Sequence, residues 1–121
     1  MSTQLNITTT ASSAGPIMAL TGELDHDTVL QVHQALLALE LHTGQQLTVD
    51  LTHLTFCDSS GISVLLAARN RAIRDSALFA LAAVPAGTVR MFAIVGLDRV
   101  LPVFPTADQA VATWTRTDDP S

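Results

Sequence analysis

Apolar and polar positions follow two different periods along the chain. Short runs of alternating or continuous apolar residues predict strands, and longer segments with an apolar residue every three or four positions predict helices. The segment Leu47-Thr48-Val49-Asp50-Leu51 is typical of a central strand. The predicted strands cover residues 4–10, 16–20, 47–51, 78–84 and 100–104, and the predicted helices cover residues 28–41, 62–74, 85–95 and 107–114.

Residues that favour helix ends lie at several of these boundaries. Asp25 or Asp27 is placed to cap the first helix through its carboxylate, and Thr106 is placed to cap the last helix. Pro85 suits the first turn of the third helix, because its missing N–H would have no partner there. Gly96 is expected to end that helix.

Strands that alternate with helices after an opening hairpin predict an α/β fold with a mostly parallel sheet. A chain of 121 residues fits one domain, because two separate cores would each be small. The domain is expected to span residues 1–114, with a flexible C-terminal tail at residues 115–121. The pattern alone leaves open whether the helices cover one face of the sheet or both.

Composition then removes several classes of function. Acidic residues outnumber basic ones, the net charge is −5, and all the basic residues are arginine, so a nucleic-acid binder or an anionic-membrane binder is not expected. The single cysteine, Cys57, excludes an intramolecular disulfide and a cysteine-rich zinc site. The first residues lack the pattern of a signal peptide, and no apolar run approaches the roughly 20 residues of a membrane helix. A cytoplasmic location is therefore expected.

The most informative segment is Asp58-Ser59-Ser60-Gly61, which joins a strand to a helix. Unpaired N–H groups at a helix start attract anions, so this turn is a candidate anion site. Plain helix capping by Asp58 or a serine is the simpler alternative. A serine-hydrolase elbow is not matched, because Gly61-Ile62-Ser63-Val64-Leu65 lacks the last glycine of that motif. A phosphate-binding P-loop is excluded by the absence of lysine.

Cysteine and histidine chemistry gives weaker candidates. Cys57 and His53 could form a nucleophile–base pair, but a cysteine beside Phe56 at a strand end more commonly packs as a small apolar residue. The histidines lack the close spacing of metal ligands. The sequence therefore predicts neither a bound cofactor nor a metal site, and it does not predict an enzyme.

Four segments together resemble the STAS-domain anti-sigma factor antagonists of bacterial partner-switching systems. They are Gly22-Glu23-Leu24-Asp25, the strand at residues 47–51, the turn Phe56-Cys57-Asp58-Ser59-Ser60-Gly61-Ile62, and residues 84–104. The resemblance covers residues 4–114. It implies a STAS-like fold, with a mixed five-stranded sheet, an antiparallel first strand, and about four helices packed mainly on one face.

The resemblance also implies a function. Members of this family bind an anti-sigma factor that is also a serine kinase, and so release a sigma factor; phosphorylation ends the binding, and a PP2C-type phosphatase restores it. The phosphorylated serine of the family matches Ser59. The phosphorylation loop and partner-binding residues that the match implies are Asp25, Asp58, Ser60, Gly61, Ile62 and Ser63. For Ile62 and the nearby Leu66, core packing is an equal alternative.

Three interpretations stay open at this point. The first is an anti-sigma factor antagonist switched at Ser59, and the second is a STAS interaction, scaffold or sensor module unconnected to a sigma factor. The third is an enzyme with Ser59 or Cys57 as nucleophile. The identities of the kinase, phosphatase and sigma factor, and a weak homodimer, are left open by the sequence.

Overall fold

Strands and helices alternate along the chain after an opening hairpin, as the pattern predicts. The structure is a computed structural model that describes residues 5–117. Its strands are β1 (Asn6–Ala11), β2 (Pro16–Leu24), β3 (Gln46–Asp50), β4 (Leu54–Cys57), β5 (Leu78–Ala82) and β6 (Val103–Phe104). Its helices are α1 (Val29–Ala38), α2 (Ser59–Arg74), α3 (Ala86–Val95), a short 3-10 turn at Leu97–Arg99, and α4 (Ala107–Thr117).

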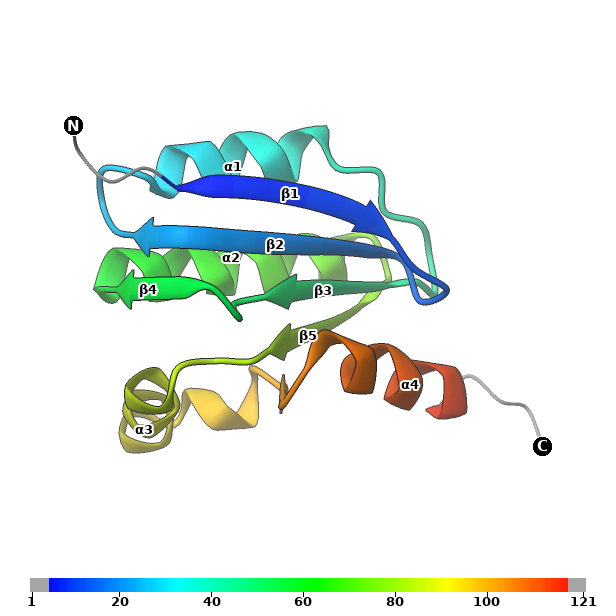
Figure 1. The fold of residues 1–121 in the computed structure, drawn as a ribbon. Helices are drawn as coiled ribbons and strands as arrows, with labels where there is room; N and C mark the ends of the chain where they lie inside the picture. The colour runs from blue at the N-terminus through cyan, green and yellow to red at the C-terminus, as the bar shows by residue number, and fades with distance from the viewer. Residues whose placement is uncertain (1–4, 118–121) are drawn as a thin grey trace.

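The strands form one mixed sheet in the order β1-β2-β3-β5-β6 (Figure 1). β1 is antiparallel to β2, as predicted, and the other pairs are parallel. The sheet has six strands rather than the five expected, because β4 pairs with the end of β2 beyond the last residue of β3. With four residues, β4 is too short for its apolar pattern to be read as a strand.

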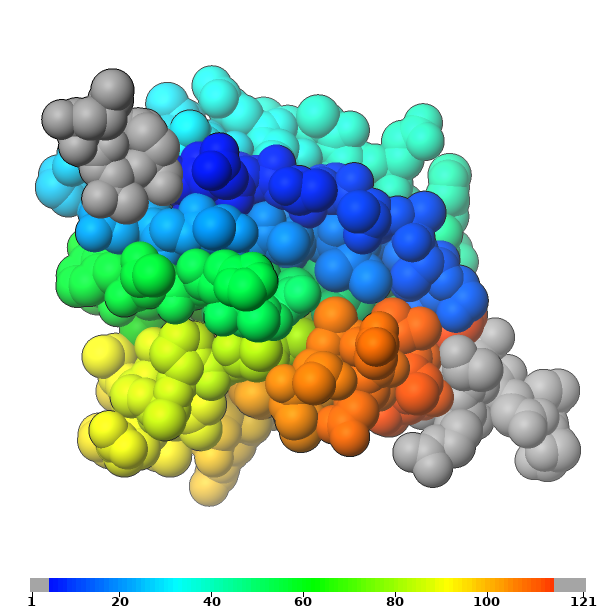
Figure 2. All heavy atoms as spheres, in the orientation of Figure 1, coloured from blue at the N-terminus to red at the C-terminus, as the bar shows by residue number. Residues whose placement is uncertain are grey.

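The helices divide between the two faces of the sheet. Figure 1 shows α1 and α2 together behind the strands. α4 lies against the other face, because Gln46 of β3 reaches it: the Gln46 Nε2 group donates to the carbonyl of Ala110 at 3.2 Å. In Figure 2 the orange atoms of α4 are accordingly on the near side. The helices therefore lie on both faces of the sheet, whereas the resemblance implies that they pack mainly on one face.

The core is aliphatic, as the composition indicates. Successive side chains of a strand point to opposite faces, and four successive residues of β3, Gln46 to Val49, are all buried, so both faces are covered at the centre of the sheet. Gln46 and Thr48 are buried polar residues, and Gln46 Nε2 also donates to Thr48 Oγ1 at 3.1 Å. These bonds satisfy the polar groups that face α4.

Several predicted boundaries shift. α2 begins at Ser59, three residues earlier than predicted, so Ser59, Ser60 and Gly61 form its first turn. α4 begins after Thr106, whose Oγ1 accepts from the Gln109 N–H at 3.1 Å as predicted for a cap. α4 continues to Thr117, so its helical backbone includes residues that were predicted to be a flexible tail. Residues 118–121 lie outside the described residues.

Candidate functional site: the start of helix α2

Two neighbouring strands end side by side at the candidate site. β2 and β4 are parallel, and Leu24 lies opposite Cys57 at their last paired position. The contact continues one residue beyond β4, where the Asp58 N–H donates to the Leu24 carbonyl at 3.3 Å. The turns that carry Asp25 and Asp58 therefore start from adjacent positions, so the sheet brings together two loops that are distant in the sequence.

Asp58 caps helix α2. Its backbone is extended, and its side-chain oxygen Oδ1 accepts from the Gly61 N–H at 3.1 Å. Its carbonyl accepts the first helical hydrogen bond, from the Ile62 N–H at 3.1 Å. Asp58 thus fills the capping role that the sequence left open between Asp58 and the serines, and Ser59 and Ser60 become the first two residues of the helix.

Gly61 lets α2 start directly against the end of β2. A Cβ atom at this position would lie 2.7 Å from Cys57 Sγ, 2.8 Å from the Leu24 carbonyl oxygen and 2.9 Å from Leu24 Cγ. These separations are shorter than van der Waals contact, and the carbonyl cannot rotate away. The glycine therefore has a packing role: it fixes the position of the first turn and with it the position of Ser59.

The three serines of this region have different surroundings. Ser59 is exposed at the tip of the helix, whereas Ser60 is half-buried. Ser63 is exposed one turn later, and its hydroxyl donates to the Ser59 carbonyl at 3.1 Å. Ser59 is therefore the exposed serine of the first turn of α2.

Ile62 belongs to the core. Its side chain is only 8% exposed and packs within the main apolar cluster. Leu66, the next candidate along the helix, is half-buried against the same cluster. Of the two alternatives considered for Ile62, the structure thus favours packing, and the exposed side chains of the first two turns of α2 are Ser59 and Ser63.

The Asp25 turn is organised by a residue that sequence reasoning missed. Thr28 is buried; its hydroxyl donates to the Glu23 carbonyl at 2.8 Å and accepts from the Asp25 N–H at 3.0 Å. The Asp25 carboxylate accepts from the Asp27 N–H at 3.0 Å, inside the turn. The prediction that Asp25 or Asp27 caps α1 is wrong, because the residue at the N-cap is Thr28 and no side chain makes a capping bond there. A threonine three residues after an aspartate is a weak sequence signal, so Thr28 could be found only from the structure.

Cys57 is unsuited to act as a nucleophile at neutral pH. Burial, with a further contribution from the charge of Asp58, raises the pKa of its thiol to about 11. The thiol hydrogen bond runs to the Asp58 carbonyl, at 3.6 Å, and the His53 side chain is exposed. Since the thiolate is the reactive form, this environment is that of a packed, inert cysteine.

Two further observations concern the described part of the chain. Among residues 5–117, no cluster of three or more histidine, cysteine, aspartate or glutamate side chains is arranged to hold a metal ion. Within the same residues, none of the helices has the length and apolar character needed to cross a membrane.

Comparison with known proteins assigns the chain to a family. The family model described as "Mlab, STAS domain" matches residues 7–103. The match covers most of the chain, and the chain belongs to the STAS-domain family.

Solved structures share this fold at low sequence identity. An anti-sigma-factor antagonist (STAS) domain protein from Planctomyces limnophilus is 21% identical, with 90% of this chain and 97% of that chain covered and a TM-score of 0.77. The Bacillus cell fate determinant SpoIIAA in the phosphorylated form is 21% identical, with 93% and 98% covered and a TM-score of 0.61. A sulfate transporter family protein from Wolinella succinogenes is 16% identical, with 83% and 84% covered and a TM-score of 0.71.

Proposed function

We propose that this STAS-domain protein is an anti-sigma factor antagonist that is switched by phosphorylation at Ser59. In its unphosphorylated form it binds an anti-sigma factor that is also a serine kinase, and the bound sigma factor is released. Phosphorylation by that kinase ends the binding, and a PP2C-type phosphatase restores the active form. The exposed Ser59 in the first turn of α2, directly after the Asp58 cap, is the observation that carries this proposal.

The geometry supports Ser59 over its neighbours. Ser60 is half-buried, and the Ser63 hydroxyl is bonded to the backbone of the preceding turn. Ser59 is exposed and stands beside the Asp58 cap, on a turn that Gly61 holds against β2. A Bacillus protein with this fold has been solved in a phosphorylated form, which agrees with a modified residue in a domain of this kind.

The chain acts as a substrate in the transfer step. The Ser59 hydroxyl is not acidic at neutral pH, so the kinase supplies the base that takes its proton and the Mg²⁺-bound ATP that donates the phosphoryl group. An O–P bond forms at Ser59 Oγ, the bond to the terminal phosphate of ATP breaks, and ADP leaves. No group of this chain needs to act as a catalyst.

The added phosphate changes the charge of the docking surface. It brings about −1.5 to −2 charge units beside Asp58, on a chain whose net charge is already −5. The amide groups at the start of α2 partly stabilise this charge, so the fold is retained. A kinase surface that fits a neutral serine then meets like-charge repulsion, and the complex dissociates.

Calorimetric titration of the anti-sigma factor kinase into variants of this protein tests the proposal. Ser59→Ala should bind as tightly as the wild type and resist phosphorylation, while Ser59→Asp should bind about a hundredfold more weakly, a difference of roughly 3 kcal/mol. Ser63→Asp is the matched control, with the same charge one helical turn away, and should lose less affinity. Equal affinities of the Ser59→Asp and wild-type proteins would refute the switch.

We place this function in the cytoplasm, where sigma factors act. The second candidate is a STAS interaction module that is not connected to a sigma factor, and the shared fold of a sulfate transporter family protein favours keeping it. Affinity capture with the Ser59→Ala protein separates the two. Recovery of a kinase of the anti-sigma type supports the first function, and recovery of other partners without such a kinase supports the second.

A further inference from the structure

β1 is an edge strand without the usual protection. It pairs with β2 on one side, and within residues 5–117 no strand pairs with its other side. Natural sheets protect such edges with charged side chains, prolines or bulges. The sequence of β1, Asn-Ile-Thr-Thr-Thr-Ala, has none of these, and its register with β2 is regular over all six residues.

The free hydrogen-bonding groups of this edge belong to alternate residues. Ser12 and Gly15 exchange both main-chain bonds, at 3.0 and 3.1 Å, so the next pair, Ala11 with Pro16, is of the non-bonded type. Alternation along the ladder then makes Thr10, Thr8 and Asn6 the residues bonded to β2. The N–H and C=O groups of Ile7, Thr9 and Ala11 point outward.

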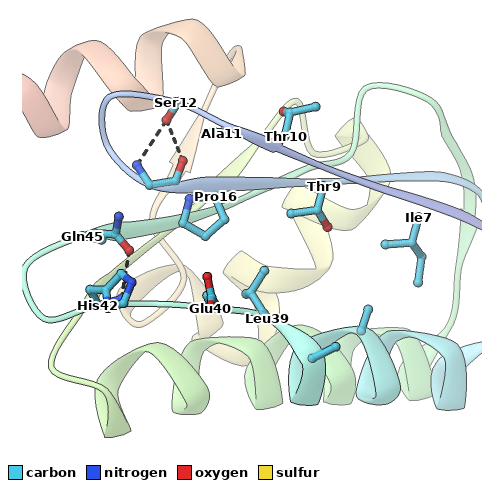
Figure 3. A pocket seen from close by; sticks show the side chains of 13 residues that line it. Ile7, Thr9, Thr10, Ala11, Ser12, Pro16, Leu39, Glu40, His42 and Gln45 are labelled. Carbon is cyan, nitrogen blue, oxygen red and sulfur yellow. Dashed lines mark hydrogen bonds between the residues drawn. The ribbon is translucent and has the colours of Figure 1, made fainter.

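A groove of about 760 Å³ lies along the same edge, between β1 and the end of α1. Figure 3 shows Ile7 and Thr9 pointing toward α1, while Thr10 points away from it. Four small residues line it, Ala11, Pro16, Ala35 and Ala38, together with larger residues that include Leu39, Glu40, His42 and Gln45. Figure 2 shows the dark-blue atoms of β1 at the surface, with the cyan atoms of α1 behind them.

We propose that a second copy of this chain binds here through antiparallel β1–β1 pairing centred on Thr9. In that register Ile7 of one copy lies opposite Ala11 of the other, and Thr9 lies opposite Thr9. All three outward-facing residues of one strand then meet outward-facing residues of the other, and each such pair exchanges two hydrogen bonds. The edge is therefore complementary to itself, as a two-fold interface requires.

The groove favours the same register. Residues directly opposite in a sheet point to the same face, so Ile7 of the second copy extends over the helix side of Ala11. There it enters the groove, whose lining on this side includes Pro16 and Ala38. β1 carries no charged residue, so no like charges meet within the strand pair. An isoleucine from the partner thus fills space that the monomer leaves empty.

Charge substitutions at Thr9 test the register. Because Thr9 is exposed and lies opposite itself, Thr9→Lys or Thr9→Glu places two like charges in contact, and each variant should dimerise about fivefold or more weakly than the wild type. An equimolar mixture of the two variants should restore the dimer. Thr8→Lys is the matched control, because residue 8 lies opposite residue 10 of the other copy and should leave dimerisation unchanged.

Sedimentation equilibrium over a wide concentration range measures these effects. The wild type should approach twice the chain mass of 12.8 kDa as concentration rises. Thermal unfolding of each variant shows that the fold is intact, which exposure of both threonines predicts. A wild type that stays monomeric throughout, a mixture that stays monomeric, or equal weakening by Thr8→Lys would overturn the proposal. None of these outcomes bears on Ser59.

Discussion

Replacing Gly61 with alanine adds one methyl group at the point where α2 meets the ends of β2 and β4. The new Cβ would lie 2.7 Å from Cys57 Sγ and 2.8 Å from the Leu24 carbonyl oxygen. Ordinary contacts of a carbon atom are about 3.5 to 4.0 Å, so the first turn of α2 must move outward by roughly 0.7 to 1.3 Å. The Asp58 cap and the Leu24 hydrogen bond lie in the same turn and would be strained with it.

The free energy of unfolding should fall by about 1 to 2 kcal/mol. Overpacking of a tight contact costs about 1 to 3 kcal/mol, and the better helix propensity of alanine returns less than about 1 kcal/mol. For a domain of this size a loss of 1 kcal/mol lowers Tm by about 4 °C, so the variant should melt about 4 to 8 °C lower. Urea unfolding followed by circular dichroism, together with a thermal melt, measures both quantities.

Gly87→Ala is the matched control, because Gly87 lies in helix α3 and its added Cβ would meet only Arg90 Nη2, at 4.0 Å. This substitution should be neutral or raise stability by up to about 1 kcal/mol. The same change is therefore expected to lower stability at Gly61 and not at Gly87. A Gly61→Ala protein as stable as the wild type, or shifted in the same direction as Gly87→Ala, would refute the close packing on which the position of Ser59 depends.

Three further predictions follow from single residues. Arg71→Met should lose about 2 kcal/mol of stability, because the Arg71 guanidinium donates to the carbonyls of Leu36 and Leu39 at the end of α1 and pairs with Asp75. Arg69→Met is the control, because it removes only an exposed contact to Asn70, and its stability should stay within about 0.5 kcal/mol of the wild type. Urea unfolding measures both variants. Asp58→Ala should lose about 1 kcal/mol and Asp58→Asn much less, since asparagine can still cap α2; equal losses in thermal melts would count against capping. The pKa of Cys57 is about 11 in the folded protein and 9 for an ordinary thiol, so the unfolded chain releases its proton first and stability should fall as pH rises from 9 to 11. The chain has no tyrosine or lysine to titrate in that window, so a Cys57→Ala protein with the same pH slope in urea unfolding would contradict the assignment.

The sequence predicts most of the fold, because the central elements have clear periods. β3 alternates polar residues with Leu47 and Val49, β5 is a continuous apolar run, and the Asp58-Ser59-Ser60-Gly61 turn combines a capping residue with a helix start. β4 is missed because its four residues are too few to establish a period. β2 is predicted too short because Gly22, at a φ of 114°, reads as a break but is a bulge within the strand.

The parts of the site that sequence cannot supply depend on contacts between distant segments. Arg71 bonds to the Leu36 carbonyl, 35 positions away, and nothing in the local pattern of α2 indicates this. The restriction at Gly61 comes from Leu24 on another strand. The pairing of β2 with β4 that brings Asp25 and Asp58 to adjacent turns is likewise a tertiary feature. Local propensity identifies the turn, and packing decides which of its residues are exposed.

The most direct test of the central claim is to locate the phosphate. The wild type, Ser59→Ala and Ser63→Ala proteins are incubated with the anti-sigma factor kinase and ATP, and each is mapped by mass spectrometry of its peptides. We predict a single phosphate on Ser59 in the wild type and in Ser63→Ala, and none in Ser59→Ala. Stoichiometric phosphorylation of Ser59→Ala, at Ser60 or at any other residue, would contradict the account.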